Sequence, residues 1–148
     1  MDFGFDLDKA QIATAIIGEL GNNVFDHNLG SWPLNIGGAI ILGQNFPNKK
    51  KVKMIVSDPG IGFKNSLKHK KPKNEIEAIK LGLKGISGWV GVKRGNGLKI
   101  IQEWTINRFS GILKIQSGDG LVILEAKEIK SRVEKKITGT IIEITLRY

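Results

Sequence analysis

The sequence predicts an α+β fold, a two-layer α/β sandwich in which a mixed, mostly antiparallel sheet is covered on one face by helices. Two observations predict it: the strand-like segments can pair with their sequence neighbours, and the helical segments are grouped apart from them. The chain has 148 residues, of which 41% are hydrophobic and 25% charged, as in ordinary globular domains. We therefore expect residues 1–148 to form a single domain.

The first helix is expected from about residue 8 to residue 29. Asp6 or Asp8 can cap its start, and Gly30 marks its end with Pro33 just beyond. Apolar residues at helical spacing predict the stripe that faces the core, namely Ala13, Ile17, Leu20 and Val24.

A hairpin of two strands, 35–44 and 51–58, is expected next. From residue 63 to residue 94 the composition changes to lysine, glycine and polar residues, with one short helical patch capped by Asn74 and ended by Gly85. Unstructured segments of such length in compact domains are usually functional lids or disordered, so we expect a long, mobile excursion here.

The last third of the chain is expected to begin with a helix over 98–109, which ends before Gly111. Glycine turns then separate apolar or alternating segments, as in an antiparallel meander. These segments predict three strands: 112–117, 121–126 and 140–146.

The net charge of +9 is concentrated in the middle of the chain. Thirteen of the 23 Lys and Arg residues, but only three of the 14 acidic residues, lie between Lys49 and Arg94. A basic segment can bind a polyanion such as nucleic acid. Aromatic residues for stacking on bases are scarce beside these lysines, however, so a nucleic-acid-binding module is the least favoured of the functions considered.

Composition excludes several other classes of site. The chain has no cysteine, which excludes disulfides, thiolate zinc sites and cysteine nucleophiles, and its two histidines are too few for a histidine-rich metal site. No apolar run approaches the roughly 20 residues that cross a bilayer, and the first residues lack the layout of a signal peptide. We therefore expect a cytoplasmic protein without membrane contact.

Three polar residues, Glu19, Asn23 and His27, lie four residues apart on the first predicted helix and so share one side of it. One interpretation is the polar margin of an amphipathic helix. The other is chemical, because a carboxylate can orient or deprotonate a nucleophile and an amide oxygen one turn away can ligate a hard cation.

A second candidate motif follows the apolar strand that ends at Asp58, where Gly60 and Gly62 come next. Asp, Pro and Gly are the commonest turn residues, so a plain turn is one explanation. In the alternative, the carboxylate accepts a hydrogen bond from an exocyclic amine, and the glycines let the backbone approach a flat ligand.

The third candidate motif, Arg94, Gly95, Gly97 and Leu98, opens the second long helix. A glycine-rich helix N-terminus offers free N–H groups and the positive end of the helix dipole to a phosphate. The motif fits neither the P-loop nor the dinucleotide fingerprint. As a fourth candidate, Thr140 begins the last strand, where its hydroxyl could join the strand-end carboxylate beneath a base.

The order and spacing of these four motifs resemble the four boxes of the GHKL ATPase superfamily, and the match runs from Glu19 to Leu146. The resemblance implies a GHKL ATPase fold with ATP and Mg²⁺ as ligands. It implies that Asn23 coordinates Mg²⁺, that Glu19 is the base or orients water, and that Asp58 binds the adenine amino group, helped by Thr140.

The resemblance also assigns the remaining motif residues. Gly60 and Gly62 would shape the adenine pocket, and residues 63–94 would be the ATP lid. The phosphates would contact Arg94, Gly95, Gly97 and the N–H of Leu98.

Two functions remain open within the resemblance. Glu19 four residues before Asn23 is typical of the ATPases and of anti-sigma-factor serine kinases, and the short chain is similar to the latter. The first interpretation is therefore a protein kinase that transfers the γ-phosphoryl group of ATP to a regulatory partner protein. The alternative is the catalytic domain of a sensor histidine kinase, or a regulatory ATPase. Either allows a partner protein or domain, and a homodimer.

Overall fold

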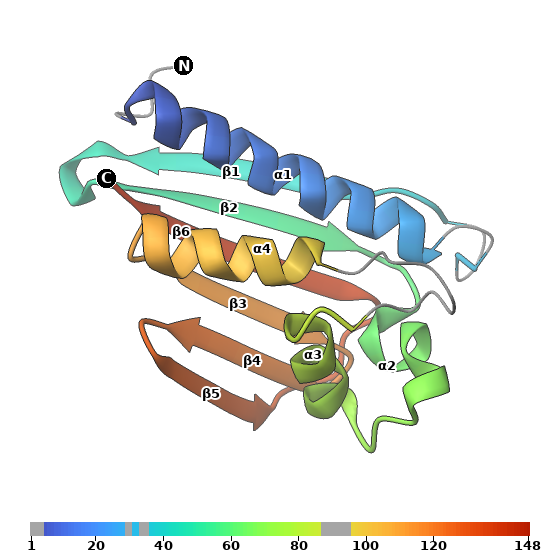
Figure 1. Cartoon of the computed structure of the whole chain (residues 1–148). Helices are drawn as coiled ribbons and strands as arrows, with labels where there is room; N and C mark the ends of the chain where they lie inside the picture. Colours follow the sequence, from blue (N-terminus) through green and yellow to red (C-terminus); the bar gives the residue numbers. More distant parts are fainter. Residues whose placement is uncertain (1–4, 29–30, 33–35, 87–95) are drawn as a thin grey trace.

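The chain forms a six-stranded sheet whose strand order is β1-β2-β6-β3-β4-β5 (Figure 1). A computed structural model describes residues 5–28, 31–32, 36–86 and 96–148. The strands are β1 (Ile40–Phe46), β2 (Lys51–Asp58), β3 (Ile112–Ser117), β4 (Gly120–Glu125), β5 (Glu128–Val133) and β6 (Thr140–Arg147). The α+β class is confirmed, and every pair of neighbouring strands described is antiparallel, whereas the sequence predicts a mixed, mostly antiparallel sheet.

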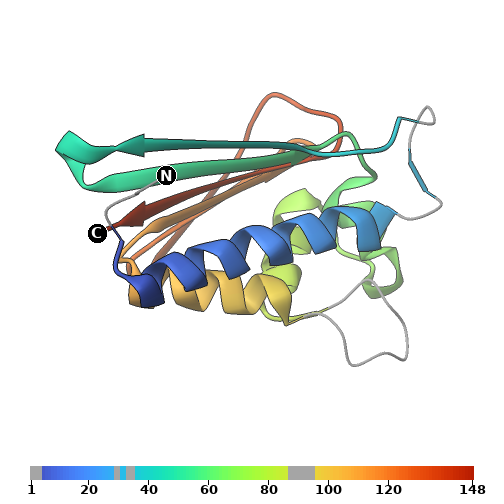
Figure 2. The ribbon, with the colours of Figure 1, turned by 90° about the horizontal axis from the view of Figure 1, so that it is seen from above.

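The described part of the chain contains four α-helices, which lie on one side of the sheet (Figure 2). They are α1 (Leu7–Asn28), α2 (Gly62–Ser66), α3 (Glu75–Leu83) and α4 (Gly97–Glu103), the last of which continues into a π-helical turn, Trp104–Arg108. Helices α1 and α4 run alongside each other over the strands, and α2 and α3 lie toward the end of the sheet where β2 finishes. None of these helices is long and apolar enough to cross a membrane.

The core fills the space between the helices and the sheet. Alternate residues of β2 and β6 point toward the helices and are buried, among them Val56 and Ile144, because side chains of a strand alternate between its two faces. Helix α1 meets them with a stripe that includes Leu20 and Val24. Ile16 is fully buried in that stripe, whereas Ile17, which the spacing predicts there, is only partly buried.

Strand β6 lies between β2 and β3, although it comes last in the chain. Its register places Thr140 directly opposite Asp58 on β2 and directly opposite Ser117 on β3. All three side chains are buried on the helix side of the sheet, since each belongs to the inward-facing half of its strand. One end of the sheet therefore carries a row of three buried polar residues.

Strand β5 is absent from the sequence prediction. All six of its residues are exposed, and charged residues alternate along it, so it has no buried face to produce an apolar pattern. It forms because its backbone pairs with β4 at the edge of the sheet. Strand β1 is also shifted, to Ile40–Phe46 from the predicted 35–44, and all but its last two residues are exposed.

The expectation of a long, mobile excursion over 63–94 is wrong for the described residues, 63–86. Asn74 caps α3 as predicted, since its side chain accepts a hydrogen bond from the Glu77 N–H at 2.9 Å. Ala78 and Ile79 of α3 are completely buried, and the helix packs on β3 and β4. This segment is part of the folded core, and the rest of the predicted lid, 87–94, lies outside the described residues together with Arg94 and Gly95.

We predict that Gly139→Ala lowers the free energy of unfolding by about 1–3 kcal/mol or more. Gly139 precedes β6 with a φ of 79°, which disfavours any side chain, and a Cβ there would overlap the backbone carbonyl of Asp58. Urea unfolding followed by circular dichroism measures the change.

Gly43→Ala in β1 is the matched control, because a Cβ on Gly43 would meet nothing within 4 Å. It should change the free energy of unfolding by no more than about 1 kcal/mol. Equal losses in the two variants would contradict the explanation.

Candidate functional site

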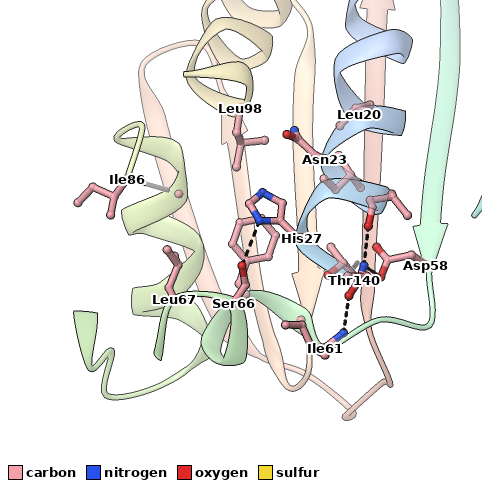
Figure 3. Close-up of a pocket in the computed structure, with 16 residues that line it drawn as sticks. Leu20, Asn23, His27, Asp58, Ile61, Ser66, Leu67, Ile86, Leu98 and Thr140 are labelled. Carbon is pink, nitrogen blue, oxygen red and sulfur yellow. Dashed lines mark hydrogen bonds between the residues drawn. The ribbon is translucent and has the colours of Figure 1, made fainter. Parts of the chain in front are cut away.

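A pocket opens where the C-terminal half of α1, the end of β2, α2 and the start of α4 converge (Figure 3). The pocket is open to solvent on one side. Most of its wall is apolar, and a few polar side chains are placed among these apolar groups. The polar lining includes Asn23, His27, Asn28, Asp58, Ser66 and Thr140.

Asp58 lies at the end of β2, and the alternation of that strand turns its side chain inward, where only 8% of it is exposed. Its Oδ1 accepts hydrogen bonds from the Gly60 N–H at 2.8 Å and from Asn28 Nδ2 at 3.2 Å. Burial raises the pKa of Asp58 above its ordinary value of 3.8, and these two donors oppose the rise. The site therefore holds a desolvated carboxylate that prefers a further hydrogen-bond donor.

Thr140 is 7% exposed and faces the same pocket from β6, as the direct cross-strand partner of Asp58. A hydroxyl can both donate and accept hydrogen bonds, so it suits a ligand edge that carries both kinds of group. The structure brings these two residues together, although 82 positions of sequence separate residue 58 from residue 140.

Helix α1 supplies the other end of the site. Asn23 and His27 line the pocket one turn apart, and Glu19 lies a further turn back. The start of α4 meets them, because a Cβ on Gly97 would lie 2.7 Å from Glu19 Oε2 and 3.6 Å from Asn23 Oδ1. Because Gly97 has no side chain, the backbone at the start of α4 can approach the polar residues of α1 closely.

Of the remaining predicted site residues, Arg94 and Gly95 lie outside the described part of the chain. Leu98 is 7% exposed and lines the pocket, as does Gly62. Gly60 does not line this pocket but packs against the side-chain amide of Asn28, which a Cβ on Gly60 would overlap.

His27 lines the pocket between α1 and α2. Its Nδ1 and Ser66 Oγ share a hydrogen bond at 3.2 Å. Burial lowers the pKa of His27 from its ordinary value of 6.5, and the nearby Asp26 carboxylate opposes that effect. The lowered pKa favours the neutral imidazole of His27, and its hydrogen bond ties α1 to α2 beside the pocket.

Asn28 is the site residue that the sequence interpretation missed. It ends α1, is only 3% exposed, and contacts both Asp58 and the loop that follows β2. A signal was present, because position 28 continues the apolar stripe four residues after Val24. A polar residue at a core position of a helix requires hydrogen-bond partners elsewhere in the fold.

Within the described residues, no three or more His, Cys, Asp or Glu side chains cluster as metal ligands. Asn23, which lines the pocket, offers an amide oxygen that could face a cation, and the Glu19 carboxylate lies beside the nearby backbone of Gly97. Mg²⁺ commonly takes one or two protein oxygens and completes its shell with substrate phosphates and water. The Asn23 oxygen is therefore compatible with a Mg²⁺ ion that arrives with a phosphate ligand.

The sequence matches no protein-family model and no curated protein. Any functional assignment therefore depends on the chemistry of the pocket.

We predict that Asp58→Asn raises the free energy of unfolding at pH 7. The amide oxygen can still accept from Gly60 and Asn28, while the cost of burying a charge disappears. Because the folded pKa of Asp58 is raised, its contribution to stability is complete below the ordinary value of 3.8 and is lost as pH rises through the folded pKa. The gain should thus be largest near neutral pH.

Denaturant unfolding of both proteins at a series of pH values measures this difference. It should shrink as pH falls through the folded pKa of Asp58, because the wild-type carboxyl becomes neutral there. A difference that is constant with pH would show that Asp58 carries no buried charge.

Proposed function

We propose that this chain is a GHKL-type ATPase domain that binds Mg²⁺·ATP in the pocket between α1 and the end of the sheet. The observation that carries the proposal is the cross-strand pair of Asp58 and Thr140, which faces the same cavity as Asn23 and Leu98. Four motifs separated along the chain therefore converge on one pocket, in the order that the superfamily uses.

The base end of the proposed site is formed by Asp58 and Thr140. The buried carboxylate already accepts two hydrogen bonds at Oδ1, and neither donor reaches Oδ2. An adenine amino group is a suitable donor for the second oxygen. The threonine hydroxyl beside it can bond the ring nitrogen directly or through water. Apolar neighbours such as Leu20 and Ile142 suit the faces of a purine.

The phosphate end is formed by the start of α4 and the polar side of α1. The first backbone N–H groups of a helix have no partner within the helix, so those of Gly97 and Leu98 are available to phosphate oxygens. Asn23 would hold Mg²⁺ there. When bound, the ion neutralises phosphate charge and orients the γ-phosphoryl group.

We further propose that the domain is a protein kinase, which transfers the γ-phosphoryl group to a serine of a regulatory partner protein. Glu19 supports this reading, since its carboxylate lies beside Gly97 at the phosphate end. There it can accept the proton of an attacking hydroxyl or orient a water molecule. A sensor histidine kinase domain or a regulatory ATPase is the alternative, and it would share the ATP site.

We predict Mg²⁺-dependent ATP binding by isothermal titration calorimetry. Asp58→Asn should weaken binding about 10- to 100-fold, because a second amide would face the adenine amine in place of an acceptor. Asn23→Ala should lose most of the gain in affinity that Mg²⁺ provides to the wild type. Asn22→Ala, an exposed neighbour, is the matched control and should bind as the wild type does. If Asn23→Ala and Asp58→Asn both bind like wild type, the site assignment is wrong.

Glu19→Gln is expected to keep ATP affinity within about threefold while lowering phosphoryl transfer roughly 10²- to 10⁴-fold, since the amide cannot take a proton. Release of labelled phosphate from γ-labelled ATP, and label transfer to proteins of a cell extract, report the two fates of the phosphoryl group. Acid-stable label identifies a hydroxyl acceptor, and acid-labile label a histidine. An unchanged rate in Glu19→Gln would exclude Glu19 as the base.

A further inference from the structure

Asn28 occupies a position where an apolar residue would be expected. It lies four residues after Val24 in the buried stripe of α1, and 3% of it is exposed. A buried amide is costly unless its hydrogen-bonding groups are satisfied. Its place in the fold therefore requires specific partners.

The side chain of Asn28 finds three partners. Its Nδ2 donates to the Val24 carbonyl at 2.8 Å and to Asp58 Oδ1 at 3.2 Å, and its Oδ1 accepts from the Ile61 N–H at 2.8 Å. This orientation of the amide is fixed by chemistry, because the flipped amide would turn its oxygen toward a carbonyl and a carboxylate. Asn28 thus joins the end of α1 to the end of β2 and to the following loop.

The carboxylate of Asp58 is held from one side only. Asn28 Nδ2 and the Gly60 N–H both bond Oδ1, so the two donors fix the rotation of the carboxylate. They leave Oδ2 as the oxygen for any further donor in the pocket. Gly60 packs directly on the Asn28 amide, since a Cβ would overlap it, and the loop therefore keeps this geometry.

We propose that Asn28 is a positioning residue for base recognition: it holds Asp58 so that Oδ2 is presented to an exocyclic amine of the bound base. This inference rests on the proposed function, because it concerns how the ATP site selects an amino-bearing base. Asn28 acts through Asp58 and the 60–61 loop. Its position on α1 also couples base recognition to the helix that carries Asn23.

The substitution Asn28→Asp tests the electrostatic part of the arrangement. It would place a second carboxyl group against Asp58 Oδ1 and the Val24 carbonyl, where the present amide donates. Two adjacent buried carboxyl groups cannot both ionise readily, so one would be protonated and the hydrogen-bond pattern would change. Loss of the base preference in this variant supports the proposal, and full retention overturns it.

The decisive readout is the ratio of the affinity for Mg²⁺·ATP to that for Mg²⁺·purine riboside triphosphate, which lacks the amino group. In the wild type we expect a ratio of about 10 to 100. Asn28→Ala should reduce it at least fivefold while changing affinity for the purine analogue less than about threefold. A purely structural role would weaken both nucleotides equally and leave the ratio unchanged.

Asn65→Ala is the matched control, because the Asn65 amide donates to the Ile61 carbonyl at 3.0 Å and so contacts the same loop without touching Asp58. It should keep the wild-type ratio. A wild-type ratio in Asn28→Ala overturns the positioning role alone. Absence of ATP binding in the wild type overturns the proposed function and this inference with it.

If Asn28→Ala does not fold, NMR of the wild type tests the positioning role of Asn28 instead. The side-chain amide protons of Asn28 are expected to shift more with Mg²⁺·ATP than with the purine analogue, since only ATP engages the carboxylate that they bond. Equal shifts with the two nucleotides overturn the proposal.

Discussion

Strand β6 is hydrogen-bonded on both sides, to β2 and to β3, and this double pairing assembles the pocket. It brings Asp58, Thr140 and Ser117 into one row, although they belong to three separate segments of the chain. The row cannot form until the last strand has joined the sheet, so the site depends on the most distant pairing in the sequence. Contacts of this kind form late in folding, because a long loop must be closed first.

The loop that follows β2 and the start of α2 are held from two directions. Asn28 binds the loop from helix α1, through the Ile61 N–H. On the other side, Ser117 Oγ accepts from the Phe63 N–H at 2.9 Å and donates to Glu75 Oε2 at 3.0 Å. The loop is thereby fixed to α1, to β3 and to α3, and a ligand bound against it would contact a preorganised backbone.

Much of the fold was predictable, because strong periodic patterns report buried faces. The bounds of β2 and β3 agree with the prediction, and α1 agrees to within a residue, because each has a clear apolar side. Strand β5 has no buried side and was not predictable. For α3 the sequence indicates the cap, Asn74, but not that a short lysine-flanked helix would pack on the sheet.

The candidate site was predictable in its residue types but not in its packing. Motif order pointed to Glu19, Asn23, Asp58 and Thr140, whereas Asn28 lies outside these motifs, and two of its three partners, Asp58 and the Ile61 N–H, belong to other segments of the chain.

Burying a carboxylate lowers the stability of the folded protein unless donors surround it, and Asp58 is surrounded on only one side. The two donors at Oδ1 offset part of the cost, and the raised pKa is the sign of what remains. A ligand that donates a hydrogen bond to Oδ2 would offset the remaining desolvation cost of the carboxylate. That offset would contribute to the free energy of binding. Replacing Asp58 by a neutral residue would raise the stability of the folded protein and at the same time lower its affinity for such a ligand. This trade-off is expected of a functional residue rather than of a structural one.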